Sequence, residues 1–317
     1  KEDVPHLIAE NLLWFGKDGK SKPSKKLFLT DVKQGLTPTT WWPHDEVGHN
    51  DESKKDIKSL FDSESPFQTP KPVRLIRRII HLTMGPDDLA LDFFAGSGTT
   101  GHAVMKQNAI DNGNRRYILV QLPEALDPNV KSQKLAAEMC MKLQKPLNIA
   151  ELTKERLRRA AKKIKDENPM FAGDLGFRVF KLDSSNIRAW EPDRDDLDRT
   201  LLDHAEHLKE GRTEQDILYE LLLKLGLDLC VPIEQKTLAG KAVHSIGGGV
   251  LIACIATQIT HDEVEPLAQG IAAWHKALAP AGDTTCVFRD SAFADDVAKT
   301  NTAAILQQHG IAHVRSL

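Results

Sequence analysis

The chain has 317 residues, a formal net charge of −3 and 27% charged residues, and its length allows two domains with hydrophobic cores of their own. The mild charge excludes neither nucleic acid nor a small molecule as ligand. The four cysteines are scattered without a Cys-x-x-Cys pair, and no apolar run reaches membrane-spanning length. We therefore expect a cytoplasmic protein without a disulfide framework, a zinc site, a signal peptide or a membrane anchor.

Residues 1–65 have the least regular pattern in the chain. A short helix followed by a strand is expected at residues 8–15. Residues 17–26 contain five lysines, which fit either contact with DNA phosphates or a solvated loop. Trp41 and Trp42 lie in a predicted loop, where packing against the sheet is favoured over stacking on a base or covering a cofactor.

Residues 89–104 combine a strand, a glycine turn and the start of a helix. The strand, which ends near Leu91, is predicted to be buried, and the helix begins at Thr99. Gly96 and Gly98 permit positive backbone dihedral angles and a close approach of backbone N–H groups to a ligand. A side chain at Gly98 is expected to occupy the space of that ligand.

Two classes of ligand fit this turn. Residues 96–101 match the dinucleotide fingerprint Gly-x-Gly-x-x-Gly, which is a weak signal by itself. Asp92, at the end of the strand, repels a pyrophosphate but suits a ligand with a cationic end. S-adenosylmethionine has an ammonium, a sulfonium and no phosphate, so it is favoured over NAD. No Lys-Ser or Lys-Thr follows the turn, which excludes a P-loop.

The sequence DFFAGSGTT (residues 92–100) resembles the cofactor motif of amino-group DNA methyltransferases. This family also has a phenylalanine and a Thr-x-Lys-Pro motif in its cofactor pocket. Carried over residue by residue, that second match consists of Phe67, Thr69, Lys71 and Pro72. Two linked motifs at this spacing are more specific than either motif alone, and together they imply binding of S-adenosylmethionine.

A second buried strand is predicted at residues 116–122, after a turn at residues 111–114. Its tip is expected to face the cofactor ribose, where an acid is common, but the residue there is Gln121. An amide can bond two hydroxyls without the charge assistance of a carboxylate. Glu124 is the alternative, and the choice between them is open. The predicted cofactor-binding residues are Phe67, Thr69, Lys71, Asp92, Phe93, Phe94, Gly96, Ser97, Gly98, Thr99 and Gln121.

Three helices are predicted around these motifs, at residues 73–82, 131–142 and 149–165. The last contains seven basic and two acidic residues. Such a helix can lie along DNA, although long basic faces are more often only solvated. We expect residues 66–165 to be the S-adenosylmethionine-binding part of a methyltransferase domain, preceded at 1–65 by a connector and the end of a target-recognition region.

The composition changes from Asp174 onward. Residues 177–182 alternate as in a half-buried strand, and residues 191–210 predict an acidic helix. A domain of order β-β-α-β-α-β, with a triple-glycine hairpin turn, is expected within residues 166–317 and is assigned to subunit interaction. Its expected elements are a helix at 217–227, strands at 241–246 and 250–256, a helix at 262–278, a strand at 284–289, a helix at 294–309 and a strand at 312–315.

Residues 176–190 and 292–317 resemble the modification subunits of type III restriction–modification systems. In these subunits the order of the methyltransferase motifs is permuted. The catalytic motif, Asp/Asn/Ser-Pro-Pro followed by an aromatic residue, comes before the cofactor motifs. The chain contains no Pro-Pro pair, and the family uses this motif to hold a flipped adenine. With a first residue Lys1, we expect the cofactor-binding and C-terminal portion of a DNA adenine-N6 methyltransferase that is inactive alone.

The resemblance implies an α/β fold, in which part of a Rossmann-like S-adenosylmethionine-dependent methyltransferase sheet is followed by a second, smaller α/β domain. It also implies three partners: double-stranded DNA, a second copy in a homodimer, and a restriction (helicase-nuclease) subunit. No catalytic residue or metal ligand is assigned. Two other hypotheses stay open, a NAD-type oxidoreductase and a non-catalytic subunit-interaction module.

Overall fold

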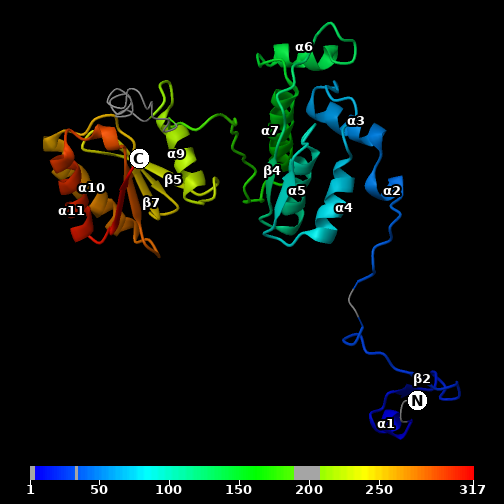
Figure 1. The fold of residues 1–317 in the computed structure, drawn as a ribbon. Helices are drawn as coiled ribbons and strands as arrows, with labels where there is room; N and C mark the ends of the chain where they lie inside the picture. Colours follow the sequence, from blue (N-terminus) through cyan, green and yellow to red (C-terminus); the bar gives the residue numbers. More distant parts are fainter. Residues whose placement is uncertain (1–3, 33–34, 189–207) are drawn as a thin grey trace, which may run out of the picture. The chain divides into compact units, whose positions relative to one another are not determined.

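The computed structural model describes residues 4–32, 35–188 and 208–317. The chain divides into two compact units, Lys1–Phe177 and Arg178–Leu317 (Figure 1). Helices and strands occur in both units, which confirms the predicted mixed α/β class.

The described elements of the first unit are α1 (Val4–Ala9), β1 (Leu13–Trp14), β2 (Ser24–Lys25), α2 (His44–Val47), α3 (Asn50–Leu60), α4 (Val73–Thr83), β3 (Leu89–Asp92), α5 (Thr99–Asp111), β4 (Arg116–Leu119), α6 (Lys134–Lys142) and α7 (Ile149–Glu167). The helix and strand expected at residues 8–15 are present, although the helix begins earlier, at Val4. The lysine-rich residues 17–26 are almost all exposed.

Helix α5 lies at the centre of the first unit, where it packs against α4, α7, β3 and β4 (Figure 1). It joins β3 to β4, which pair in parallel with Leu91 beside Ile118. The turn expected at residues 111–114 is confirmed, because α5 ends there and Asn112 adopts the left-handed conformation with φ of 53°. Helix α3 was not predicted, since only two of its residues, Ile57 and Leu60, are apolar and buried.

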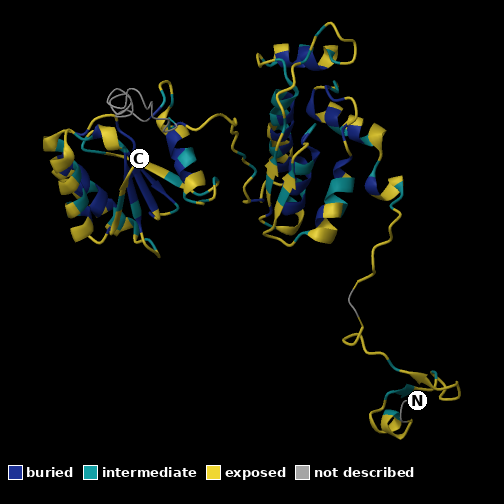
Figure 2. Ribbon diagram, in the orientation of Figure 1, coloured by how far each residue is buried: buried dark blue, intermediate teal, exposed yellow. Residues whose placement is uncertain are grey.

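The two parallel strands are covered on one face only, so the prediction of two buried strands was wrong for the other face. Helix α5 packs against both strands, and every second residue of β3 and of β4 is exposed. Apolar side chains that a parallel sheet normally buries are therefore exposed. These side chains are Leu89, Leu91, Phe93, Ile118, Val120 and Leu122, which are 47% to 67% exposed. Figure 2 colours the ribbon by burial, with exposed residues in yellow.

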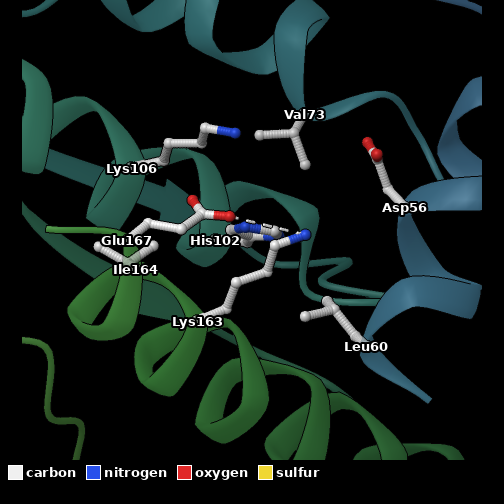
Figure 3. Close-up of a pocket in the computed structure, with 8 residues that line it drawn as sticks. All are labelled: Asp56, Leu60, Val73, His102, Lys106, Lys163, Ile164 and Glu167. Atoms are coloured by element: carbon white, nitrogen blue, oxygen red, sulfur yellow. Dashed lines mark ion pairs between the residues drawn. The ribbon is translucent and has the colours of Figure 1, made fainter. Parts of the chain in front are cut away.

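A small cavity lies between α3, α4, α5 and α7 (Figure 3). Its lining residues are Asp56, Leu60, Val73, His102, Lys106, Lys163, Ile164 and Glu167. The Nδ1 atom of His102 is buried and has no hydrogen-bond partner among the described residues. Burial, together with the charges of Arg156 and Lys106, lowers the pKa of His102 to about 3, so the imidazole is neutral at pH 7.

The described elements of the second unit are α9 (Glu214–Lys224), β5 (Ile233–Leu238), β6 (Lys241–Ile246), β7 (Leu251–Cys254), α10 (His261–Leu278), β8 (Thr285–Phe288), a 3-10 helix (Asp290–Ala292), α11 (Asp296–Gln308) and β9 (His313–Ser316). Its five strands form one sheet in the order β5-β6-β7-β8-β9. The first three strands are antiparallel, and β7, β8 and β9 are parallel.

The triple-glycine hairpin turn is confirmed, since Gly247, Gly248 and Gly249 all have positive φ and join antiparallel β6 and β7. Strand β5 was missed because its sequence, IEQKTL, is largely exposed and polar on an edge of the sheet.

The strand predicted at residues 177–182 was wrong. The alternating side chains are held by other contacts, because Arg178 donates hydrogen bonds to the carbonyls of Leu229 and Val231. The ring of Phe180 packs edge-on against Tyr219. Residues 177–182 therefore do not form a strand. Most of the acidic helix predicted at 191–210 lies outside the described residues.

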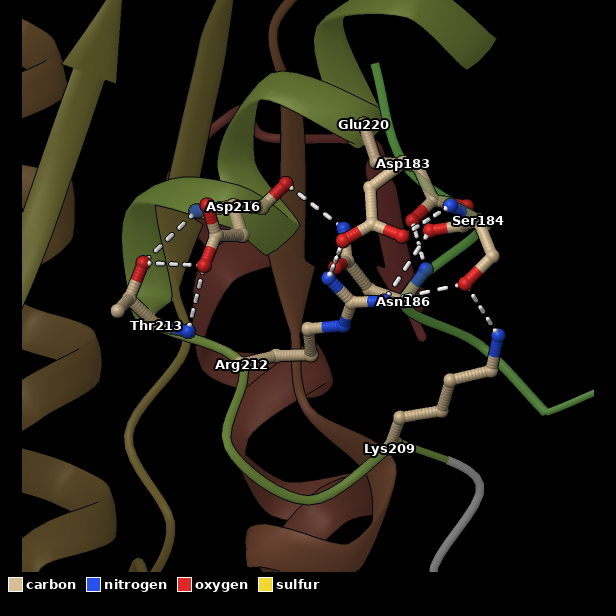
Figure 4. A network of polar contacts seen from close by, with 8 residues as sticks. All are labelled: Asp183, Ser184, Asn186, Lys209, Arg212, Thr213, Asp216 and Glu220. Atoms are coloured by element: carbon tan, nitrogen blue, oxygen red, sulfur yellow. Dashed lines mark hydrogen bonds and ion pairs between the residues drawn. The ribbon is translucent and has the colours of Figure 1, made fainter. Parts of the chain in front are cut away.

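A polar network ties residues 183–186 to the start of α9 (Figure 4). Arg212 pairs with Asp183 at 2.8 Å between Nη1 and Oδ2, and this hydrogen bond is the largest cause of an Asp183 pKa of about 2. Asn186 donates its backbone N–H to Glu220 at 2.6 Å. Burial raises the pKa of Glu220, but bonds from Ser185, Asn186 and Lys224 outweigh it and lower that pKa to about 2.

Neutralising Glu220 is expected to destabilise the second unit by about 1.5–3 kcal/mol near pH 7, the range for hydrogen bonds to a charged group. Because the pKa of Glu220 is depressed from 4.5 to about 2, its contribution is present above pH 4.5 and is lost as pH falls toward 2. Urea unfolding of wild type and Glu220→Gln at both ends of this range measures the effect. The exposed Glu234→Gln is the control, and an equal penalty for Glu220→Gln at both pH values would contradict the assignment.

Candidate functional site

The glycine turn lies between β3 and α5 and has two positive-φ glycines, Gly96 at 51° and Gly98 at 75°. A Cβ on Gly98 would lie 3.0 Å from the Thr153 Cγ2 atom and 3.6 Å from the Leu157 Cγ atom, both on α7. A Cβ on Gly96 would meet only the Phe94 carbonyl oxygen, at 3.7 Å. The expectation that a Gly98 side chain would fill ligand space is therefore corrected, since that direction faces α7 and the open side of the turn is at Gly96.

Two side chains of α7 hold this turn from behind. The Thr153 hydroxyl donates to the Gly96 carbonyl at 2.5 Å. Arg156 Nη1 lies within hydrogen-bond distance of the Ser97 carbonyl at 3.0 Å, the Ser97 hydroxyl at 2.7 Å and the Thr99 hydroxyl at 2.8 Å. The Arg156 side chain is fully buried, with 1% exposure. Burial lowers its pKa to about 10, so the guanidinium is charged at neutral pH.

The predicted residues on the strand side of the turn are brought together. Asp92 Oδ1 accepts the Phe94 N–H at 3.1 Å, and its Oδ2 accepts the Thr100 hydroxyl at 2.5 Å. Gln121 Oε1 accepts the Gly96 N–H at 2.7 Å, so the tip of the second strand braces the turn. The rings of Phe93 and Phe94 lie 5.1 Å apart and are largely exposed.

The Thr-x-Lys-Pro segment lies beside the glycine turn, because the Thr99 hydroxyl donates to the Lys71 carbonyl at 3.3 Å. Thr69 and Lys71 are exposed. Phe67 differs from them, since its side chain is buried edge-on against Phe61 in the core.

Sequence reasoning missed Thr153 and Arg156, because α7 was interpreted only as a basic surface helix. Their spacing of three residues, followed by Leu157, places them on one helical face, and that was the available signal. Several other basic side chains of α7 are occupied within the first unit. Arg159, for example, pairs with Glu155 at 2.7 Å between Nε and Oε1.

Packing against the sheet, which was the favoured interpretation of this aromatic pair, is wrong for Trp41. Trp41 is 80% exposed. The indole of Trp42 donates to the Thr39 carbonyl at 2.7 Å, and the Arg78 guanidinium of α4 lies 5.7 Å from its ring.

Across the three described ranges, no helix is long and apolar enough to cross a membrane. Those residues also contain no group of three or more His, Cys, Asp or Glu side chains placed to hold a metal ion.

Comparison with known proteins supports the motif-based resemblance. Residues 7–122 match the N6_N4_Mtase family, described as DNA methylase. The chain is 40% identical over 175 residues to the Mod subunit of the type III restriction-modification enzyme StyLTI of Salmonella typhimurium, covering 55% of this chain and 25% of that subunit. It is 29% identical over 278 residues to the EcoP15I Mod subunit of Escherichia coli, covering 85% of this chain and 38% of that subunit.

A type II methyltransferase, M.KpnI of Klebsiella pneumoniae, is 42% identical over 96 residues, which is 30% of this chain and 22% of the relative. The chain thus spans between about a fifth and two fifths of the length of these relatives. The predicted resemblance to type III modification subunits is confirmed. Residues 7–122 match the DNA methylase family, within a chain that is similar to part of the type III Mod subunits.

Proposed function

We propose that this chain is part of a DNA adenine-N6 methyltransferase of a type III restriction–modification system that uses S-adenosylmethionine. The observation that supports this most is the glycine turn directly after Asp92, which Thr153, Arg156 and Gln121 hold with its Gly96 side open. The relatives named as Mod subunits support the type III assignment.

The residues at the turn fit S-adenosylmethionine. The open space at Gly96 is a place that a Cβ would narrow, and the first N–H groups of α5 point out of the helix beside it. Asp92 supplies a carboxylate for a cationic group, and the exposed Phe93 and Phe94 offer apolar area for a ring. When bound, the cofactor supplies the activated methyl group. We propose that it is held by Phe67, Thr69, Lys71, Asp92, Phe93, Phe94, Gly96, Ser97, Gly98, Thr99 and Gln121.

Two members of this set act indirectly in our proposal. Phe67 supports the Thr-x-Lys-Pro segment from the core, edge-on to Phe61. Gln121 fixes the turn, because its carbonyl accepts the Gly96 N–H and its amide donates to the Leu122 carbonyl. The exposed Glu124 is then the candidate for the ribose hydroxyls.

We propose that β3, α5 and β4 are part of a Rossmann-like methyltransferase sheet, with the domain at residues 66–165. In this proposal another segment of the whole protein packs on the exposed apolar face of β3 and β4. The same segment carries the catalytic Pro-Pro-aromatic motif. Residues 1–65 are assigned to a connector and the end of the target-recognition region. The α/β domain at residues 166–317 is assigned to contacts with a second copy and a restriction subunit, and the whole protein to binding of double-stranded DNA.

Calorimetry on the full-length protein with S-adenosylmethionine, S-adenosylhomocysteine and NAD tests the cofactor assignment. We expect both S-adenosyl compounds to bind with micromolar affinity, on the order of −8 kcal/mol. NAD is expected to show no heat of binding, since Asp92 repels its pyrophosphate. Tight NAD binding without a response to S-adenosylhomocysteine would favour the oxidoreductase hypothesis instead.

A further inference from the structure

The guanidinium of Arg156 is buried beneath the glycine turn without a carboxylate partner in direct contact. No ion pair within 4.0 Å joins it to an acidic side chain in the part of the chain that the structure describes. Its Nη1 atom faces three oxygen atoms of Ser97 and Thr99, and its Nε atom has no hydrogen-bond partner among the described residues. The charge of Asp56 acts on Arg156 without a direct ion pair. A buried cation without a carboxylate in contact is unfavourable, so its positive field at the turn needs an explanation.

Two sources of positive electrostatic potential act at the glycine turn. Helix α5 has 13 residues, and its N-terminus is the positive end of the helix dipole. Arg156 adds a full charge directly behind the same residues, where low solvent exposure weakens dielectric screening. The negative charge of Asp92 lies on the strand side and reaches the Thr100 hydroxyl. Opposite charges on two sides of one turn match a zwitterion, which is the chemical character of an α-amino acid group.

We propose that Arg156 is a positioning residue that attracts the carboxylate of the cofactor's amino-acid end to the start of α5, while Asp92 faces the ammonium. Arg156 acts through the turn and through its charge, because its side chain is too buried to contact the ligand. This inference rests on the proposed S-adenosylmethionine site and adds to it the source of selectivity for an amino-acid end.

A pair of ligands separates this role from a structural one. S-adenosylhomocysteine carries the amino-acid group, whereas 5′-methylthioadenosine has the same nucleoside and sulfur without it. Calorimetry on full-length Arg156→Met is expected to show a loss of affinity for S-adenosylhomocysteine on the order of tenfold larger than that for 5′-methylthioadenosine. A purely structural role predicts the same loss for both ligands.

Two control variants isolate the charge. Thr153→Val removes the hydrogen bond to the Gly96 carbonyl but leaves every charge in place. It should therefore lower the affinity for both ligands by the same factor. Arg158→Met removes a partly exposed arginine of the same helix that pairs with Glu155 and lies over Phe177. Its affinity for both ligands is expected to stay within about twofold of wild type.

Arg156→Lys tests the same inference if the methionine variant is too unstable to fold. Burial lowers the pKa of a lysine at this position, and the carboxylate of Asp56 opposes that shift. The neighbouring His102 is neutral at pH 7, so the loss of charge with rising pH belongs to the introduced lysine. The variant's preference for S-adenosylhomocysteine over 5′-methylthioadenosine should then fall with rising pH relative to wild type. A preference that follows wild type at every pH overturns the inference.

The outcomes distinguish this inference from the proposed function. If the wild-type protein binds neither ligand, the cofactor assignment fails. If wild type binds S-adenosylhomocysteine and Arg156→Met weakens both ligands equally, the cofactor assignment stands and the charge role of Arg156 is wrong.

Discussion

Gly98→Val is expected to abolish cofactor binding, with at least about a hundredfold loss of affinity for S-adenosylhomocysteine. A β-branched residue resists the left-handed conformation that Gly98 adopts, with φ of 75°. Its Cβ would also lie 3.0 Å from the Thr153 Cγ2 atom. Both effects move the turn away from α7 and disturb the Arg156 contacts. Calorimetry on the full-length protein measures the loss.

Gly240→Val is the matched control for backbone strain. Gly240 has a φ of 77° in the turn between β5 and β6, and a Cβ there meets nothing within 4 Å. Its valine variant therefore carries a similar conformational penalty in the second unit without touching the glycine turn. We expect its cofactor affinity to match wild type. Unchanged affinity in Gly98→Val itself would show that the turn does not form the binding site.

The glycine turn could be predicted from sequence because its signals are local. Asp92, Gly96 and Gly98 lie within seven residues, and each constrains the backbone or the charge directly. Arg156 could not be found in this way, since it lies 57 residues from Thr99 and its contact depends on how α7 packs. The basic composition of α7 indicated solvent or DNA, whereas the buried face of that helix is set by Leu152, Arg156 and Leu157.

Burial was the least predictable property of the strands. The apolar sequence around Leu91 and Ile118 is typical of a strand covered on both faces, and both strands formed as predicted. Which faces are covered depends on elements distant in sequence, so hydrophobicity alone could not reveal the exposed side. At residues 177–182 a strand was predicted that did not form. The alternation of apolar and polar residues resembled a strand, but side-chain contacts hold Arg178 and Phe180 in another conformation.

The isolated 317-residue chain is expected not to methylate DNA, with a rate at least about a thousandfold below that of the full-length protein. Its sequence contains no Pro-Pro pair, so no recognisable group holds the adenine amine next to the cofactor. Orientation of the reacting groups accounts for a large part of the rate in such transfers. Transfer of labelled methyl groups to adenine N6 in double-stranded DNA, at saturating S-adenosylmethionine, measures the activity.

Adding a segment with a Pro-Pro-aromatic motif, in cis or in trans, should restore that transfer. The uncovered face of β3 and β4 explains why it would associate, because covering Leu91, Phe93 and Ile118 removes apolar surface from water. Leu91→Ser combined with Ile118→Ser should weaken complementation in trans while leaving the glycine turn intact. Robust methylation by the chain alone would show that its catalytic residues have been misplaced, and the exposed Trp41 beside Trp42 would be the first place to search.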